Sequence, residues 1–405
     1  MKKFLFIFFT FHVTCLICFA QWTQVSTINT TQLNGVKFFN EYTGITVGNL
    51  GIWRTTTSGI NWEQVLVSGD MFNAVSFSDV VNGTAVGMNN LIFRTTNGGI
   101  NWTQQSIGSG MSYYCVSFPT QSVGYVCGAT NGYVYKTTNA GIMWMLQWTQ
   151  VNAPYYGIYM LNQNTGSLVG IDNGERYFGT GNGGTNWITS LTSGGASLRS
   201  VTSPIILKII ATGTNGRIRL STNGGGVGWL TASSGTNQTL NAVTFLDANT
   251  FYISADSGII LKSTNGGFNW FREQTQTTNN LKGISLFSDE KGWAVGSNGI
   301  VFRKGTFTGI KQINLNIPSE FKLEQNYPNP FNPNTIIRFK IKDSRLTTLK
   351  VFDVLGKEVA TLVNEQLKPG TYEVDFDGSN LPSGVYFYKI ITDDFFQTKK
   401  MVLVK

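Results

Sequence analysis

Histidine is almost missing from this chain. The 405 residues contain a single histidine, His12, within an apolar N-terminal segment that we expect to be removed. A mature chain without imidazole cannot run a Ser-His-Asp or Cys-His mechanism, and it has no imidazole with which to ligate zinc. The sequence therefore excludes the commonest hydrolase mechanisms, and we predict no catalytic residue, no metal site and no cofactor.

Charge is also scarce, because charged residues make up only 13% of the chain. Loss of Lys2 and Lys3 with the N-terminal segment leaves 28 basic and 22 acidic side chains, with no basic run of the kind that nucleic-acid binders carry. Nucleic acid is therefore not an expected partner. A pair of carboxylates is still available for glycoside hydrolysis, and Asp172 and Asp256 occupy equivalent turns of the repeat described below.

Cysteine is limited to four residues, of which Cys115 and Cys127 remain after the N-terminal segment. They fall on two strands expected to pair as a hairpin. Residues opposed on antiparallel strands have Cα atoms about 4.5–5.5 Å apart, which is within reach of a disulfide. A bridge would be worth about 3 kcal/mol in the chain-entropy model. The alternative is two buried thiols.

Long hydrophobic runs are absent except at the start of the chain. Lys2 and Lys3 precede an apolar run over 4–19, and Ala20 follows it. A charged start, a short apolar stretch and a small residue are typical of a secretory signal, and the run is short for a membrane span. We predict a signal peptide over 1–20, cleaved after Ala20; a retained anchor is the alternative.

What the chain does contain is a repeat. The phrase Thr-Thr-Asn-Gly-Gly-x-Asn-Trp is clearest at 95–102, and its tryptophans recur every 40–43 residues. The six copies end at Trp62, Trp102, Trp144, Trp187, Trp229 and Trp270. Short β-branched and aromatic runs separated by Gly and Asn turns read as strands joined by hairpins. A repeat of this length and content predicts the blades of a β-propeller.

A seventh unit, over 281–303, lacks the turn and the fourth strand. The segment Trp22-Thr23-Gln24-Val25 resembles the fourth strands that follow Asn101 and Gln147, so we expect it to complete this unit. Closure by the N-terminus would leave no open sheet edge. We therefore predict an all-β chain with a seven-bladed propeller over 21–308.

The recurring phrase resembles the Asp-box of sialidase-type (BNR) propellers, with Asn usually in place of Asp. The whole repeat, including its Val-Gly-x-x-Gly-x-Ile-aromatic-Arg/Lys-Thr-Thr run, is similar to the propeller family of photosystem II assembly factors. The resemblance implies a fold rather than an activity. It also implies a partner surface bearing arginine, for which Arg54, Arg94, Lys136, Lys262 and Arg303 recur at one position of the third strand. The alternative is that these are ordinary outward-facing charges of a strand.

The composition changes after residue 318. Four motifs follow in order, at 323–333, 349–359, 381–388 and 400–405. Their alternating pattern predicts a small immunoglobulin-like β-sandwich over 321–405, after a linker over 309–320. Together they resemble the type A C-terminal sorting domain of the type IX secretion system. That resemblance implies a Gram-negative bacterium of the Bacteroidota or a neighbouring phylum, the secretion machinery as a partner of 321–405, and passage through the periplasm to the outside. An ordinary adhesive module is the alternative.

A propeller binds ligands most often on the loop-lined face around its central channel. The turns between second and third strands contribute one amide or carboxylate per blade to that face: Asn49, Asn89, Asn131, Asp172, Asn215, Asp256 and Asn298. Amides suit sugar hydroxyls, but Asn is also favoured in tight turns. Four aromatics that open first strands are candidate stacking platforms, although strand aromatics are often core: Phe72, Tyr113, Tyr155 and Tyr156.

These observations predict an exported, non-catalytic binding protein at the cell surface or outside the cell. Its propeller would recognise a glycan or a protein partner, with a membrane involved only through surface tethering. One alternative is a glycoside hydrolase or lyase that uses carboxylates in the channel. A second is a passive adhesive or surface-layer protein whose outer faces make the contacts.

Overall fold

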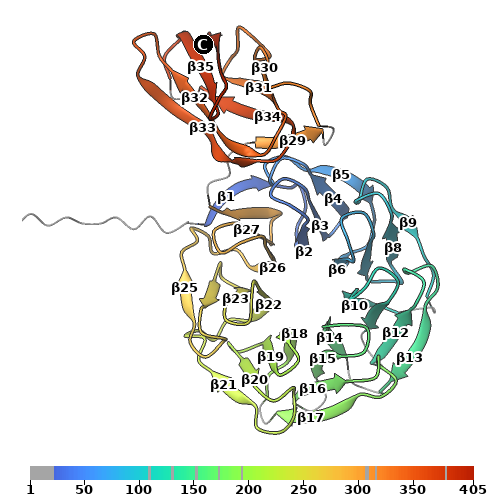
Figure 1. Cartoon of the computed structure of the whole chain (residues 1–405). Helices are drawn as coiled ribbons and strands as arrows, with labels where there is room; N and C mark the ends of the chain where they lie inside the picture. Colours follow the sequence, from blue (N-terminus) through green and yellow to red (C-terminus); the bar gives the residue numbers. More distant parts are fainter. Residues whose placement is uncertain are drawn as a thin grey trace, which may run out of the picture. The chain divides into compact units, whose positions relative to one another are not determined.

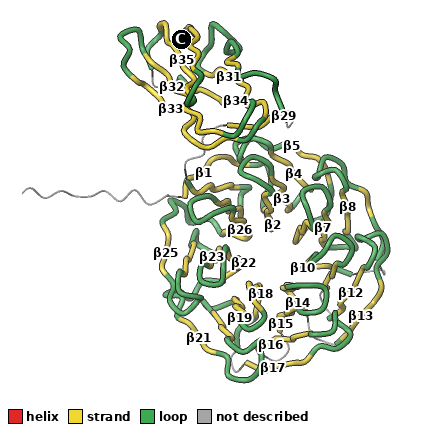
Figure 2. Tube along the Cα trace, viewed as in Figure 1, coloured by secondary structure: helices red, strands yellow, loops and turns green. Residues whose placement is uncertain are grey.

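The computed structural model describes residues 22–107, 111–128, 132–150, 154–171, 174–192, 195–305, 310–314, 317–378 and 381–405. Every regular element in these ranges is a β-strand (Figure 2). The chain divides into two compact units, one ending at Gly305 and one beginning at Thr306, and each is described by itself.

The first unit contains, within the described residues, seven four-stranded antiparallel sheets arranged around a central channel (Figure 1). The innermost strands are β2 (Leu33–Phe38), β6 (Phe72–Phe77), β10 (Tyr113–Ser117), β14 (Tyr155–Met160), β18 (Leu198–Ile205), β22 (Leu240–Phe245) and β26 (Leu281–Leu286). The second strands are β3 (Gly44–Gly48), β7 (Gly83–Gly87), β11 (Gly124–Gly128), β15 (Gly166–Ile171), β19 (Lys208–Gly213), β23 (Phe251–Ala255) and β27 (Gly292–Gly296).

The third strands are β4 (Gly51–Thr55), β8 (Ile92–Thr95), β12 (Tyr133–Thr137), β16 (Glu175–Thr180), β20 (Ile218–Ser221), β24 (Ile260–Ser263) and β28 (Ile300–Lys304). The outermost strands are β5 (Glu63–Val67), β9 (Thr103–Gln104), β13 (Met145–Thr149), β17 (Ile188–Thr192), β21 (Leu230–Ala232), β25 (Phe271–Glu273) and β1 (Trp22–Thr27). We number the blades one to seven from β2 to β26. The all-β propeller predicted from the repeat is confirmed.

The N-terminal strand completes the last blade. β1 pairs with β28 in a register that sets Trp22 opposite Lys304 and Thr27 opposite Ile300. The Trp22 ring is buried, and its Nε1 donates to Glu273 Oε2 of blade six over 2.6 Å. The predicted closure is confirmed, and the strand joins the first and last parts of the propeller.

The polar groups of each Asp-box turn form hydrogen bonds within the turn itself. In the second box, the Thr95 hydroxyl oxygen accepts from the Gly99 N–H over 3.0 Å. The side-chain oxygen of Asn97, Oδ1, accepts from the Asn101 N–H over 3.0 Å. Trp102 Nε1 donates to the Gly99 carbonyl. Gly99 has a φ of 79°, and a Cβ there would lie 2.4 Å from Ile45 Cδ1 of the preceding blade. These motifs therefore build the turn and pack it on its neighbour.

The recurring cations of the third strands connect neighbouring blades. Arg54 Nε donates to Gly98 O over 3.0 Å, Arg94 Nε to Ala140 O over 2.6 Å, and Lys136 Nζ to Gly183 O over 2.8 Å. In each case the acceptor is a turn carbonyl of the next blade. Lys262 instead pairs with Asp289 of blade seven. These side chains hold the ring together, which accounts for their recurrence without an external partner.

The second unit is a sandwich of two four-stranded sheets. One has the order β29 (Ile310–Asn314), β34 (Gly370–Asp377), β31 (Asn334–Ile341), β30 (Lys322–Leu323); the other is β33 (Glu358–Leu367), β32 (Arg345–Phe352), β35 (Gly384–Ile391), β36 (Phe396–Leu403). Both sheets contribute to one core around Phe339, Val374, Leu349 and Tyr388. β29 lies inside the segment predicted as a linker, so that assignment is wrong for 310–314, which pair with β34.

Candidate functional site at the channel mouth

A β-bulge recurs near the start of every innermost strand. In β2, Leu33 pairs with Gly48 and Gly35 with Val47, which leaves Asn34 as an extra residue; the same shift occurs in the other six blades. A bulge re-aims the side chain of the extra residue. The seven bulged residues line a cavity of about 380 Å³ at the mouth of the channel: Asn34, Asn73, Tyr114, Tyr156, Arg199, Asn241 and Lys282.

Below the mouth, a collar of small residues forms the channel wall. The collar consists of Gly35, Ala74, Cys115, Gly157, Ser200, Ala242 and Gly283. The innermost strands approach closely here, because a Cβ on Gly157 would lie 2.9 Å from the Arg199 carbonyl oxygen. Valine and isoleucine line the wall beyond the collar. Polar groups are therefore concentrated at the mouth.

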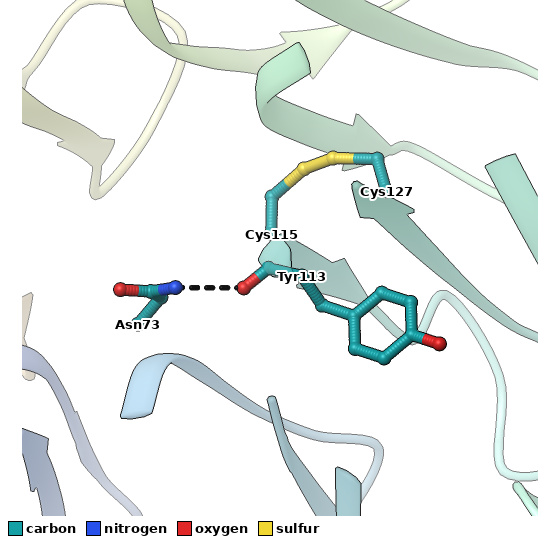
Figure 3. Close-up of a disulfide and its surroundings, with 4 residues drawn as sticks. All are labelled: Asn73, Tyr113, Cys115 and Cys127. Carbon is teal, nitrogen blue, oxygen red and sulfur yellow. Dashed lines mark hydrogen bonds between the residues drawn. A yellow bond between two sulfur atoms is a disulfide. The ribbon is translucent and has the colours of Figure 1, made fainter. Parts of the chain in front are cut away.

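Three amides of the mouth are fixed by the neighbouring blade. Asn34 Nδ2 donates to Phe72 O, Asn73 Nδ2 to Tyr113 O, and Asn241 Nδ2 to Leu281 O, each over 2.8 Å. Figure 3 shows the bond from Asn73 to the Tyr113 carbonyl. These bonds orient the amides while their carbonyl oxygens keep acceptor capacity for hydroxyl groups.

On one side of the mouth, three side chains from consecutive blades are in contact with one another. The Tyr114 and Tyr156 rings have centroids 5.4 Å apart and planes tilted by 44°. The Arg199 guanidinium lies over the Tyr156 ring, with Cζ 4.4 Å from its centroid. All three side chains are half-buried. Aromatic faces beside a cation form a rigid shelf with one apolar face and one charged end.

The opposite side of the mouth carries a neutral polar cluster. Lys282 Nζ lies 2.7 Å from Asp256 Oδ1, which also accepts from Asn241 Nδ2 over 2.8 Å. Lys282 further donates to Asn241 Oδ1 over 3.3 Å. The charges of Lys282 and Asp256 therefore compensate each other within the mouth.

The disulfide lies in the channel wall. The structure joins Cys115 of β10 to Cys127 of β11, with Cα atoms 5.3 Å apart (Figure 3). The two residues are directly opposed in the ladder, as their positions in the repeat indicate. Cys115 belongs to the collar, so the bridge fixes the strand that presents Tyr114.

The predicted ring of turn residues does not line the cavity as a set. Of its described members, only Asp256 lines the mouth. Asn89, Asn215 and Asn298 adopt positive φ angles of 51°, 57° and 59°, which shows that they serve the turns themselves. Asn49 donates to Thr31 Oγ1 beside its own turn. Asn131 and Asp172 lie outside the described residues.

The predicted platforms Phe72, Tyr113 and Tyr155 are also wrong, because all three rings are fully buried. They precede the bulge and point into the blades, whereas the next residue faces the channel. Of the four aromatics named from the sequence, Tyr156 is the one that lines the mouth. Tyr114, Arg199, Lys282 and the three amides were missed; the available signal was their shared position after the large apolar residue that opens each innermost strand.

A larger hollow, about 440 Å³, lies between blades four and five. It is lined partly by Ile206 and Leu207 of an apolar hairpin, and partly by the longer Asp-box of blade five around Gly226. That box shifts its tryptophan, so Trp229 Nε1 donates to Ser190 of blade four. No charged side chain appears among its described lining residues, which makes the mouth the better candidate for a polar ligand.

Family models match both the propeller and the C-terminal part of the chain. The model of the photosynthesis system II assembly factor YCF48 family matches residues 16–304, which is most of the chain. The chain belongs to this family. Residues 325–405 match the secretion system C-terminal sorting domain, which supports secretion through the type IX system to the cell surface or the extracellular space. None of the curated proteins matches the chain significantly.

Solved YCF48 structures have the same fold. The structure titled "YCF48 bound to D1 peptide" is 21% identical, with a TM-score of 0.61, and the match covers 72% of this chain and 97% of that chain. YCF48 from Cyanidioschyzon merolae is 18% identical, with a TM-score of 0.58 and coverages of 71% and 99%. The WD40 β-propeller domain of Doa1 is 14% identical, with a TM-score of 0.57 and coverages of 71% and 98%. At these identities the likeness shows the fold alone.

Within the described residues, no group of His, Cys, Asp and Glu is placed to hold a metal ion. The described residues also include no helix of the length and hydropathy that a membrane crossing requires.

Proposed function

We propose that this YCF48-family chain is an exported, non-catalytic binding protein whose propeller holds an extracellular glycan at the channel mouth. The observation that carries the proposal is the set of seven bulged residues, which brings three fixed amides, two tyrosines in ring contact and two cations around one cavity of about 380 Å³. Oriented amides and aromatic faces provide both hydrogen bonds and apolar surface, which a sugar ring requires.

Binding is favoured over catalysis by the distribution of acids. Among the described residues of the mouth, Asp256 is the one carboxylate, and Lys282 and Asn241 already occupy it. Glycoside hydrolysis needs two carboxylates flanking the scissile bond. If the alternative of a glycosidase were correct, the protein would release reducing sugar from the glycan that it binds.

A protein partner is the second candidate. It is favoured by the structure of YCF48 bound to D1 peptide, because this chain shares the family and the fold with that protein. We propose that, in this case, an extended segment of an outer-membrane or extracellular protein would use the same mouth.

Export completes the proposal. The sorting domain supports type IX secretion, and we propose that the predicted signal peptide over 1–20 first delivers the chain to the periplasm. The mature chain would then act on the cell surface or in the surrounding medium.

A glycan array tests the function directly, using the chain without residues 1–20 and a heat-denatured sample as control. We expect saturable binding to one glycan class, weakened about tenfold or more by Tyr156→Ala, because a stacked ring contributes about 1.5 kcal/mol. The matched control is Tyr133→Ala on a third strand. If folded protein binds no glycan on the array, glycan binding is rejected and the protein partner becomes the favoured candidate.

A further inference from the structure

We infer that the ligand at the channel mouth is an acidic glycan, whose carboxylate binds Arg199 and whose sugar ring lies against Tyr156 and Tyr114. This inference rests on the proposed function, because it names the ligand class of the same site. It follows from where unused charge and hydrogen-bonding capacity lie in the mouth.

Arg199 is a cation whose charge is not compensated by the described residues of the mouth. Its Nε is buried and has no hydrogen-bond partner in the described structure. A buried charged N–H without an acceptor carries a desolvation penalty that a ligand acceptor would remove. Among the residues that line the mouth, Lys282 is the other cation, and it is already paired with Asp256 at 2.7 Å. An incoming anion is therefore directed to the Arg199 side.

The contact with Tyr156 holds the guanidinium beside the shelf. Its Cζ lies 4.4 Å from the centroid of the Tyr156 ring, and its N–H groups point outward in the guanidinium plane. A planar fork of this kind matches a carboxylate through two parallel hydrogen bonds, and stacking reduces the freedom that is lost on binding. A carboxylate, which has two acceptor oxygens in one plane, therefore suits this geometry better than an anion with a single acceptor atom.

The neighbouring shelf indicates what carries the carboxylate. Tyr114 and Tyr156 continue from Arg199 across two blades, and they remain half-buried with accessible surface. Their faces can pack against the C–H face of a sugar, while their hydroxyls and the oxygens of Asn34 and Asn73 meet its hydroxyl groups. A uronic acid combines a ring with an apolar C–H face, hydroxyl groups and one carboxylate.

The lining favours such a glycan over a peptide. The residues of the mouth are Gln32, Asn34, Asn73, Tyr114, Tyr156, Arg199, Thr239, Asn241, Asp256 and Lys282, so the described lining includes no aliphatic side chain. Valine and isoleucine line the channel wall only below the collar. A peptide would find no apolar pocket for its side chains at this mouth.

Isothermal titration of the chain without residues 1–20 tests the inference. The probes are uronic-acid oligosaccharides (oligogalacturonate, oligoalginate and oligoglucuronate), a neutral oligosaccharide of matching linkage, a sulfated oligosaccharide, and a peptide with a free C-terminal carboxylate. We expect one uronate to bind about tenfold or more tightly than its neutral counterpart, since a hydrogen bond to a charged group is stronger than one between neutral groups. Its affinity should fall as salt is raised.

Two variants of Arg199 distinguish the effect of the planar guanidinium from the effect of a positive charge alone. Arg199→Gln should lose about tenfold or more in uronate affinity, and Arg199→Lys should recover only part of it, because lysine lacks the planar fork. Arg272→Gln, on the exposed outer strand β25, is the matched control and should leave affinity unchanged. Equal unfolding midpoints would show that all three variants are folded.

Several results would overturn the inference. Equal binding of neutral and acidic sugars, insensitive to Arg199→Gln, would reject the carboxylate site but leave the glycan-binding function standing. Preference for the sulfated probe would reject a carboxylate as the anion. Binding of the peptide alone would reject the glycan and support the protein partner. No binding of any probe by folded protein would reject both the inference and the proposed function at this mouth.

Discussion

At the scale of single residues, Glu175 is the acid whose surroundings are most constrained. Its side chain is fully buried at the start of β16, where Arg217 Nε lies 2.7 Å from Oε1 and Arg219 Nε 2.6 Å from Oε2. Both arginines belong to blade five, so one carboxylate of blade four holds the two blades together. Desolvation opposes burial of such groups, and the cluster is stable only while it is complete.

Glu175→Gln should therefore destabilise the protein by about 3–5 kcal/mol, because it leaves the buried Arg219 and the partly exposed Arg217 without a compensating charge. Urea unfolding followed by tryptophan fluorescence measures the loss. Glu290→Gln is the control, since Glu290 is exposed. A change for Glu175→Gln as small as that for Glu290→Gln would show that the carboxylate does not hold the blades.

Tyr125 predicts a specific response to alkaline pH. Its hydroxyl donates to Gly183 O over 3.0 Å and to Gln163 O over 3.1 Å, both in the next blade. Burial raises the pKa of Tyr125 to about 12, above the value near 10 expected for an unfolded tyrosine. The folded state thus disfavours the phenolate. The contribution of neutral Tyr125 to the free energy of unfolding is complete below pH about 10 and is lost as pH rises towards about 12.

Tyr125→Phe should lower the free energy of unfolding at pH 7 by about 1–2 kcal/mol and flatten its decline above pH 10. Unfolding measured at intervals from pH 7 to pH 11.5 gives both quantities. A decline as steep as that of the wild type would mean that Tyr125 does not contribute to the alkaline response.

At the scale of strands and turns, sequence and structure agree on the repeat and diverge at the bulge. The Gly-Gly turn fixes where third and fourth strands meet, and the reappearance of Trp-Thr-Gln at 22–24 revealed the closing strand. From the sequence, Phe72 and Tyr155 are expected at the channel because they open innermost strands. The extra residue in each innermost strand moves the next position there instead, and a bulge depends on the paired strand, which local alternation does not reveal.

The closing strand depends on its first residue. Trp22 fills a site between blades six and seven and is held by Glu273. Trp22→Ala should destabilise the propeller by about 3–5 kcal/mol, since it empties a buried aromatic site and removes a hydrogen bond. Thermal unfolding measures this, with the exposed Gln24→Ala as control. An unchanged transition would show that the ring is stable without β1 anchored.

The disulfide stabilises the hairpin that presents Tyr114. Replacement of both Cys115 and Cys127 by Ala should lower stability by about 3 kcal/mol in the chain-entropy model, given a sequence separation of 12. Reduction of the wild type under mild denaturant should reproduce the loss, while the double variant should not respond to reductant. Equal stability with and without reductant would indicate that the bridge contributes little to the folded state.

At the scale of the whole molecule, the proposed binding site and the sorting domain belong to two separate units. The sandwich has its own core, drawn from both of its sheets, and the propeller core is divided among its blades. Deletion of 321–405 should therefore leave a folded propeller that is no longer secreted. Fractionation of cells producing each form, with immunoblotting of periplasm and medium, measures this. Equal release of both forms would contradict a role for the sandwich in export.

The central claim is that the bulged residues at the channel mouth bind the ligand. Hydroxyl-radical footprinting of the mature chain, with and without a glycan identified on the array, tests this most directly. We predict that oxidation of Tyr114 and Tyr156 falls on binding, while oxidation of Met143 and Met145, exposed at and beside the outer strand β13, stays constant. Protection confined to the outer strands, with Tyr114 and Tyr156 unchanged, would contradict the account and favour an adhesive role for the outer face.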